Sequence, residues 1–297
     1  MNERKKDLVS IIIVTFNELC ATKRCLKSIR ECTSGDYELV IVDNASTDGT
    51  CEYLKSFGFC KVIFNSENVG FASGINQGAR ISEGKYLMLL NNDTVVTSGW
   101  FEKMVACLEL NSAFALVGPM TNDPDTGAQF YRPALFSYVD YDYFKAVYGH
   151  LFQGRYAHQL LQIGAYRNER ELMQFAWKFF PVAGVPSYRK TNCLAGFCVL
   201  IRRSWVDELG FLDERFKNGG EDNDLNIRTL LAGKKIVVAE NAFVHHDAGR
   251  SFFGAGVDRW PHFAKNRKLL EEKWEKVPRA QRILEEYASM VWKGWLR

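Results

Sequence analysis

Short apolar runs alternate with helical patterns along the chain up to residue 118. Runs rich in apolar or β-branched side chains predict buried strands, at 9–15, 37–42, 61–64, 86–90 and 114–118. Between them, apolar residues recur at helical spacing, as Cys25, Leu26 and Ile29 do. Regular alternation of strands and helices is typical of a parallel sheet with helices on both faces. The pattern therefore predicts an α/β fold with a mostly parallel central sheet.

This rhythm stops at about residues 123–190, where aromatic residues are frequent and no strand period is visible. We interpret this region as a helical insertion that packs beside the active face. Strand patterns return at 196–202 and 236–239, and an amphipathic helical pattern begins at 263. We therefore expect one domain at 1–262, insertion included, followed by a C-terminal helical tail at 263–297.

Composition narrows the class of protein. The chain has 297 residues, of which 47% are hydrophobic and 25% charged, as in an ordinary globular protein. A net charge of +3 without a basic run or aromatic platform argues against nucleic acid binding. The eight cysteines form no CxxC pair, which favours reduced thiols over a zinc site or a disulfide frame. The polar N-terminus and the lack of a long apolar stretch predict a cytoplasmic protein.

Polar side chains follow three of the predicted strands: Thr15 and Asn17, then Asp43, then Asn91-Asn92-Asp93. The carboxyl ends of parallel strands meet at one edge of a sheet, where open α/β sheets bind their ligands. A carboxylate such as Asp93 is suited to a divalent cation, and Asp43 to a ribose hydroxyl or a base N–H. Each group alone would be explained more simply as a polar turn.

A dinucleotide-binding fold is the first alternative, and the glycines argue against it. Thr-Phe-Asn-Glu follows the first strand, where that fold needs GxGxxG. Gly70, Gly74 and Gly78 come later at a spacing of four residues, which favours close helix packing. A dehydrogenase is therefore disfavoured.

Six short motifs occur in an order that resembles a known family. They are VSIIIVTFN (9–17), VDNASTDGT (42–50), NVGFA (68–72), LNNDT (90–94), GGEDNDL (219–225) and HDAGRS (246–251). In this order they resemble the inverting family 2 glycosyltransferases with a GT-A fold, in the rhamnosyltransferase-like branch that builds surface glycans. The resemblance covers most of the chain outside the insertion and the tail.

The resemblance implies a UDP- or dTDP-sugar donor and a Mn²⁺ or Mg²⁺ ion. Asp93 stands at the last position of the family's DxD motif and would bind the metal together with His246. His245 is the alternative, because neighbouring residues on a strand point in opposite directions. Asn at the first two DxD positions leaves one carboxylate there, so we expect weaker metal binding. The nucleotide-sugar residues that the resemblance implies are Thr15, Asn17, Asp43, Asn68, Gly70, Asn91 and Asn92.

Glu221 and Asp222 open a predicted helix, where carboxylates are also favoured by the helix dipole. The resemblance implies that Asp222 is the catalytic base, with Glu221 or Asp224 as substitutes and Glu221 in contact with acceptor hydroxyls. The expected enzyme is a hexosyltransferase-type glycosyltransferase, acting on a glycan, lipid-linked or protein acceptor.

Two other functions fit the same architecture. A non-catalytic nucleotide-sugar-binding protein is suggested by Asn91 and Asn92. A sugar nucleotidyltransferase would need a glycine-rich, basic loop after the first strand, and this chain lacks one.

The tail allows two interpretations. Its basic helix can pack on the domain with a solvated face. It can also lie on an anionic bilayer, as peripheral contact at the inner face of the membrane. The residues concerned are Lys265, Arg267, Lys268, Lys273, Trp274, Trp292, Lys293, Trp295 and Arg297.

Overall fold

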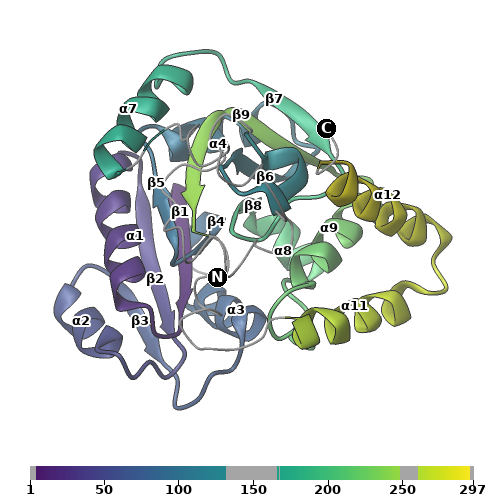
Figure 1. Ribbon diagram of the computed structural model, residues 1–297, viewed down its shortest axis with the longest axis horizontal. Coiled ribbons are helices and arrows are strands. Elements are labelled where there is room, and N and C mark those ends of the chain that lie inside the picture. The colour runs from purple at the N-terminus through teal and green to yellow at the C-terminus, as the bar shows by residue number, and fades with distance from the viewer. Residues whose placement is uncertain (1–4, 132–165, 167, 248–259, 295–297) are drawn as a thin grey trace, which may run out of the picture.

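The computed structural model describes residues 5–131, 166, 168–247 and 260–294 (Figure 1). Most of the aromatic segment before Tyr166, the end of the 246–251 motif, and Trp295 and Arg297 therefore lie outside the described residues. The strands are β1 Lys5–Thr15, β2 Tyr37–Asp43, β3 Lys61–Phe64, β4 Gly84–Asn91, β5 Thr94–Val96, β6 Phe114–Met120, β7 Tyr188–Thr191, β8 Cys198–Arg202 and β9 Lys235–His246. The helices are α1 Leu19–Cys32, α2 Thr50–Phe57, α3 Phe71–Ile81, α4 Trp100–Glu109, η1 Pro124–Gln129, α7 Glu169–Phe179, α8 Arg203–Leu209, α9 Glu221–Leu231, α11 Trp260–Trp274 and α12 Pro278–Gly294.

These strands form one mixed sheet in the order β3-β2-β1-β4-β8-β6-β9-β5, and β7 also pairs with β9. The pairs β2–β3, β1–β2, β1–β4 and β6–β9 are parallel, as the alternation predicts. β8 runs antiparallel to both of its neighbours, so its first residue, Cys198, pairs with Leu90 near the carboxyl end of β4. The segment that enters β8 is therefore brought to the edge of the sheet where polar residues follow β4.

Helices cover both faces of the sheet. On β1, Ile11 and Ile13 pack in the same cluster as α1, α2 and α4. Ile12 and Val14 point the other way, into the cluster that contains α3 and α9. The close approach of α3 to β1 depends on glycine: a Cβ on Gly78 would lie 2.5 Å from the Ile12 side chain. This confirms the predicted packing role of the α3 glycines.

Two short strands were not predicted. β7 overlaps the end of the region at about 123–190 that we interpreted as a helical insertion, and the helical expectation is wrong for its residues 188–190. Its side chains are mostly exposed, and the strand exists because it pairs antiparallel with β9. β5 likewise pairs with the end of β9, which aligns Thr94 with His246. Both strands are too short to show an alternation of apolar and polar residues in the sequence.

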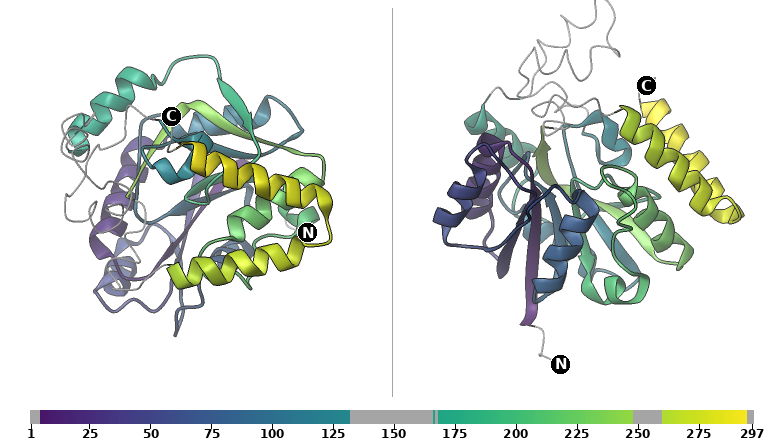
Figure 2. Two further views of the ribbon diagram at one scale, coloured as in Figure 1. Left: turned by 45° about the vertical axis from the view of Figure 1, so that its right-hand side comes forward. Right: turned by 90° about the horizontal axis from the view of Figure 1, so that it is seen from below.

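The C-terminal helices α11 and α12 are joined by a short turn after Trp274 and diverge from it in a V, with α9 close to α12 (Figures 1 and 2). The boundary that we predicted at 262/263 falls inside α11, which begins at Trp260. Lys273 and Trp274 face the domain rather than solvent: Lys273 Nζ lies 2.6 Å from the carboxylate of Asp224, and Trp274 Nε1 donates to the same carboxylate at 3.0 Å. These two side chains therefore support the packed interpretation of the tail. None of the helices in the described part of the chain is both long and apolar enough to cross a membrane.

Candidate active site

Asp43 is the last residue of β2, and only one oxygen of its buried carboxylate accepts hydrogen bonds from the described residues. Its Oδ1 accepts hydrogen bonds from Ser46 N at 3.0 Å and from Cys51 Sγ at 3.0 Å. Its Oδ2 has no hydrogen-bond partner among the described residues, although Asp43 is 0% exposed. Buried carboxylate oxygens are rarely left without donors in folded proteins. Asp43 Oδ2 is therefore suited to accept a hydrogen bond from a ligand.

Thr15 and Asn92 are buried at the same edge, but their side chains bind each other. Asn92 Nδ2 donates to Thr15 Oγ1 at 3.2 Å and to Thr22 Oγ1 at 3.1 Å. The two threonine hydroxyls are 3.1 Å apart. This network joins the ends of β1 and β4 to α1. The side chains of Thr15 and Asn92, both predicted site residues, therefore fix these strand ends relative to the helix.

Asn17 connects the loop after β1 to the loop after β2. Its Oδ1 accepts from Thr47 N at 2.8 Å, and its own N–H donates to Ser46 Oγ at 2.7 Å. Asn17 adopts the left-handed conformation, with a φ of 58°, which asparagine tolerates better than most residues. The side-chain oxygen is thus used to shape the loop around Asp43.

The turn at Gly70 joins the edge of the sheet that carries Asp43 to the loop before α9. Asn68 Oδ1 accepts from Gly70 N at 2.9 Å, and Phe71 N donates to Lys217 O at 3.0 Å. Gly70 has a φ of 87°, and a Cβ there would lie 2.8 Å from Lys217 O. Glycine is required on both counts.

Asn91 is the last residue of β4, Asp93 follows two residues later, and both lie near His246 at the edge of the sheet. His246 Nε2 lies 3.4 Å from Asp93 Oδ1 and 3.4 Å from Asn91 Nδ2. The Oδ1 atoms of Asn91 and Asp93 are both buried and make no well-formed hydrogen bond within the described structure. Asp247 N donates to Asp93 O at 2.9 Å, which ties the end of β9 to this turn.

Of the two histidines, only His246 faces Asp93. His245 points away from it: Nδ1 lies 2.7 Å from Tyr166 Oη and Nε2 lies 2.8 Å from Asp247 Oδ1. Asp247 also forms an ion pair with Arg24 of α1. The alternation along β9 therefore removes His245 from the predicted metal position.

Asp123 and Phe197 fix the orientation of the His246 ring. Its Nδ1 lies 3.1 Å from Asp123 Oδ2, and its ring stacks on Phe197 with centroids 4.7 Å apart. Burial lowers the pKa of His246, but the negative charges of Asp93 and Asp123 outweigh it and raise the pKa to about 10. The raised pKa favours the protonated imidazole of His246 beside these two carboxylates.

The chemistry of these side chains fits a divalent cation. Two ligands at right angles around such an ion lie about 3 Å apart when each bond is about 2.1 Å. The 3.4 Å between His246 Nε2 and Asp93 Oδ1 is close to that value, and Asp123 occupies the carboxylate position that commonly supports a metal-binding histidine. No three His, Cys, Asp or Glu side chains of the described residues converge on one point. Asp93 and His246 are therefore the two side chains that would hold such an ion.

Glu221 and Asp222 begin α9 and lie beside the segment that enters β8. Asp222 Oδ2 accepts from Gly196 N at 3.0 Å and Oδ1 from Asn223 N at 2.8 Å. Glu221 Oε2 accepts from Gly219 N at 2.7 Å. Burial raises the pKa of both carboxyls, and the charge of Asp222 helps to bring the pKa of Glu221 to about 8.

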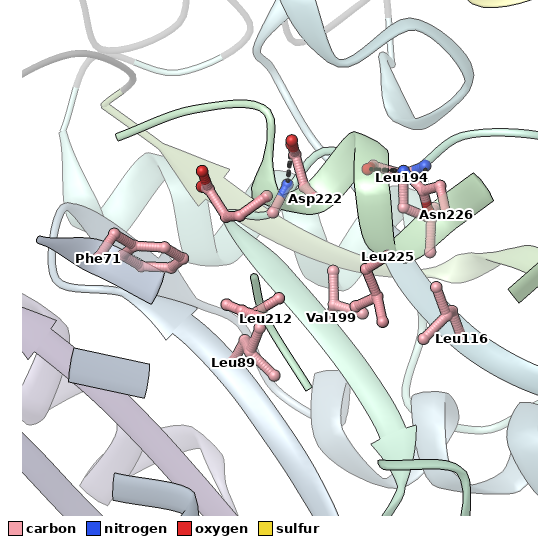
Figure 3. Close-up of a pocket in the computed structure, with 11 residues that line it drawn as sticks. Phe71, Leu89, Leu116, Leu194, Val199, Leu212, Asp222, Leu225 and Asn226 are labelled. Atoms are coloured by element: carbon pink, nitrogen blue, oxygen red, sulfur yellow. Dashed lines mark hydrogen bonds between the residues drawn. The ribbon is translucent and has the colours of Figure 1, made fainter. Parts of the chain in front are cut away.

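A small, mainly apolar cavity lies next to these carboxylates. Leu89, Val199 and Leu212 line its lower part in Figure 3, and Asp222 lies above them with its carboxylate bound to Gly196. The apolar lining contributes to the raised pKa of these carboxyls, because apolar side chains stabilise a carboxylate less than water does.

The Gly196–Phe197 segment connects the two halves of the site. Gly196 N donates to Asp222, while Phe197 O accepts from Asn91 N at 2.8 Å and the Phe197 ring stacks on His246. Asp222 and the Asp93–His246 pair therefore lie on the same edge of the sheet. Gly196 and Phe197 lie between them. The structure thus places Asp222, the predicted base, and Asp93, the predicted metal ligand, near the same segment; their roles stay predictions.

Comparison with known proteins identifies the family. The family model described as "Glycosyl transferase family 2" matches residues 10–210, more than half of the chain. The chain belongs to this family. The resemblance inferred from the six motifs is thereby confirmed.

Two relatives illustrate the range of similarity within the family. An N-acetylglucosaminyl-diphospho-decaprenol L-rhamnosyltransferase of Mycobacterium tuberculosis is 24% identical over 274 residues, which cover 88% of this chain and 82% of the relative. An uncharacterized glycosyltransferase of Haemophilus influenzae is 30% identical over 115 residues. That match spans 37% of this chain and only 36% of the relative.

Solved structures share the GT-A fold at low sequence identity. GalNAc-T7 with UDP, GalNAc and Mn²⁺ has a TM-score of 0.62 and 17% identity, covering 93% of this chain and 49% of that one. The mannosyltransferase PcManGT of Pyrobaculum calidifontis, with GDP-Man and Mn²⁺, has a TM-score of 0.52 and 15% identity, covering 95% and 75%. The predicted GT-A fold is confirmed.

Sequence reasoning missed Asp123 and Cys51 as site residues. Asp123 follows β6 as Asp93 follows β4, so the same strand-end signal was present, but we assigned it to the start of the insertion. Cys51 carried no signal, because a cysteine in a helix is an ordinary core residue.

Proposed function

We propose that the protein is an inverting, metal-dependent glycosyltransferase that moves a sugar from a UDP- or dTDP-sugar to an acceptor hydroxyl. The observation that carries this proposal is the position of Asp222 and the Asp93–His246 pair on either side of the Gly196–Phe197 segment. A sugar bound over this segment would have its diphosphate beside Asp93 and its acceptor face beside Asp222.

On the donor side, Asp43 Oδ2 would accept a hydrogen bond from the ribose or the base. Asp93 and His246 would hold Mn²⁺ or Mg²⁺, with Asp123 orienting the His246 ring. When bound, the metal would neutralise the charge that develops on the departing nucleoside diphosphate. Asn91 Oδ1, which is buried and has no hydrogen-bond partner among the described residues, would also be available to this half of the reaction.

On the acceptor side, Asp222 would remove the proton of the attacking hydroxyl. The hydroxyl oxygen bonds to the anomeric carbon while the bond to the diphosphate breaks, and that electron pair leaves with the nucleoside diphosphate. A positioned base contributes a factor of about 10² to 10⁴ to such a transfer. The raised pKa of Asp222 makes its carboxylate more basic, and the two backbone donors fix its direction. Glu221 would contact acceptor hydroxyls.

The acceptor is proposed to be lipid-linked, with a glycan or protein as alternatives. The support is the name of the Mycobacterium tuberculosis relative, which acts on a diphospho-decaprenol. Contact of the tail with the membrane would suit such an acceptor.

The test is a comparison of binding with turnover in two variants. Asp222→Asn should bind UDP or dTDP with Mn²⁺ as tightly as wild type, but release nucleoside diphosphate from the sugar donor about 10²- to 10⁴-fold more slowly. Asp93→Asn should lose the Mn²⁺-dependent part of nucleotide binding. Asp36→Asn, an exposed carboxylate just before β2, is the matched control and should change neither quantity.

Other outcomes lead to the two alternative functions. Nucleotide-sugar binding without release, in wild type and Asp222→Asn alike, would indicate a non-catalytic binding protein. Formation of a nucleotide sugar from a nucleoside triphosphate and a sugar phosphate would indicate a nucleotidyltransferase. Absence of any nucleotide binding would refute all three functions.

A further inference from the structure

The carboxylate of Asp43 is fixed by two donors that share one of its oxygens. Ser46 N and Cys51 Sγ both lie 3.0 Å from Oδ1. The side chain is fully buried, and Oδ2 has no donor among the described residues. The two contacts on Oδ1 oppose rotation of the carboxylate and keep Oδ2 in one direction.

Local structure explains how a cysteine reaches this position. Thr50 begins α2, and its hydroxyl donates to Asp48 Oδ1 at 2.6 Å, which closes the loop between β2 and the helix. Cys51 is the second residue of α2, and side chains in a helix tilt toward its N-terminus. The thiol is thereby turned back toward the end of β2, where it lies 3.5 Å from Ser46 O as well.

We propose that Cys51 is a positioning residue for the nucleotide: its S–H holds the Asp43 carboxylate so that Oδ2 can accept a hydrogen bond from the ribose or base. The inference rests on the proposed function, because it assumes that Asp43 meets the nucleotide. It adds a residue to the donor site that none of the six motifs singled out.

The chemistry of the thiol favours a hydrogen-bond role over a redox role. Burial, together with the hydrogen bond to Asp43 and its negative charge, raises the pKa of Cys51 to about 11. The sulfur therefore keeps its proton at neutral pH and remains a donor. Thiolates react with oxidants and electrophiles far faster than thiols do, so Cys51 should be a slow target. A thiolate at this position would also repel the carboxylate.

The experiment measures UDP and dTDP binding in the presence of Mn²⁺ by calorimetry. Cys51→Ala should raise the Kd for the nucleotide that wild type binds about three- to tenfold, the range expected for one lost hydrogen bond. In turnover assays, the donor KM should rise by the same factor while kcat stays within about twofold. Cys51→Ser, which restores a donor, should return both Kd and KM to within about twofold of wild type.

Three further variants complete the design. Cys60→Ala removes a partly buried thiol outside this cluster and should bind like wild type. Cys51→Val keeps volume without a donor, and it replaces Cys51→Ala if the smaller side chain impairs folding. Asp43→Ala should weaken binding more than any Cys51 variant.

The outcomes separate this inference from the proposed function. If wild type binds neither nucleotide, the proposed function fails and the inference with it. If Asp43→Ala weakens binding but Cys51→Ala and Cys51→Val do not, the role of Cys51 alone is refuted. If Cys51→Ser is as weak as Cys51→Ala, the thiol acts by packing and not as a donor, which also refutes the inference.

Discussion

Lys273 offers a sharp test of how the C-terminal helices are attached to the catalytic domain. Its Nζ lies 2.6 Å from Asp224 and 2.7 Å from Asp213, and Asp224 is 0% exposed on α9, the helix that begins with Glu221 and Asp222. We predict that Lys273→Met, which keeps most of the aliphatic stem, destabilises the protein by about 2–3 kcal/mol.

The magnitude follows from the number of contacts and their burial. A hydrogen bond to a charged group contributes about 1.5–3 kcal/mol, and breaking a buried ion pair costs about 3–5 kcal/mol. Lys273 makes two such contacts but is 19% exposed, and Asp224 keeps its partners Arg228 and Trp274. We therefore expect a cost near the lower end of these ranges.

Lys268→Met is the matched control. Lys268 is 78% exposed on the same helix, and its Nζ lies 3.7 Å from Glu272 four residues later. Exposed pairs at this spacing contribute about 0.3–0.5 kcal/mol. The two substitutions remove the same charge from the same helix, so net charge and helix propensity cancel in the comparison.

The assay is urea unfolding at pH 7, followed by circular dichroism. With a slope of about 3 kcal/mol per molar urea, Lys273→Met should lower the midpoint by roughly 0.7–1 M, and Lys268→Met by less than about 0.2 M. Equal midpoints for the two variants would refute the docked arrangement of α11.

The pH dependence provides a second check on the same variant. The hydrogen bond from Arg215, together with that from Lys273, holds the pKa of Asp213 well below its usual range in spite of partial burial. The stabilisation from this carboxylate is present above its unfolded pKa of about 4 and is lost as the pH falls through the lower folded value. The difference between wild type and Lys273→Met should therefore shrink under acid conditions.

Two further predictions concern the site itself. The pKa of Glu221 is raised from 4.5 to about 8 by burial and Asp222, so wild type should lose stability relative to Glu221→Gln as the pH rises between these values. Thermal unfolding at pH 5 and pH 8.5 measures this, and a constant difference would contradict it. Asp123→Asn should weaken Mn²⁺ binding in the presence of UDP or dTDP about 10- to 100-fold, because Asp123 orients His246. Calorimetric titration with Mn²⁺ checks this, and unchanged affinity would exclude Asp123 from the metal site.

The sequence determined the strands and the chemistry at their carboxyl ends. The β-branched and apolar runs predict β1 to β4 and β6, because burial on both faces requires apolar side chains at every position. Asp43 and Asp93 could be assigned to one edge without coordinates, since neighbouring parallel strands end together. The family was also readable, because its motifs are short local runs.

Only the tertiary structure decided which groups meet across that edge. The antiparallel direction of β8 brings Gly196 and Phe197 between Asp222 and His246, and no local pattern encodes the direction of a strand. The register of β5 on β9 selects His246 over His245. Asn91 and His246 are 155 residues apart in the chain, and other contacts in this site also join distant segments. Periodicity and strand-end polarity arise from neighbours in sequence, whereas direction, register and the pairing of a carboxylate with a ring or a thiol arise from the packing of distant segments.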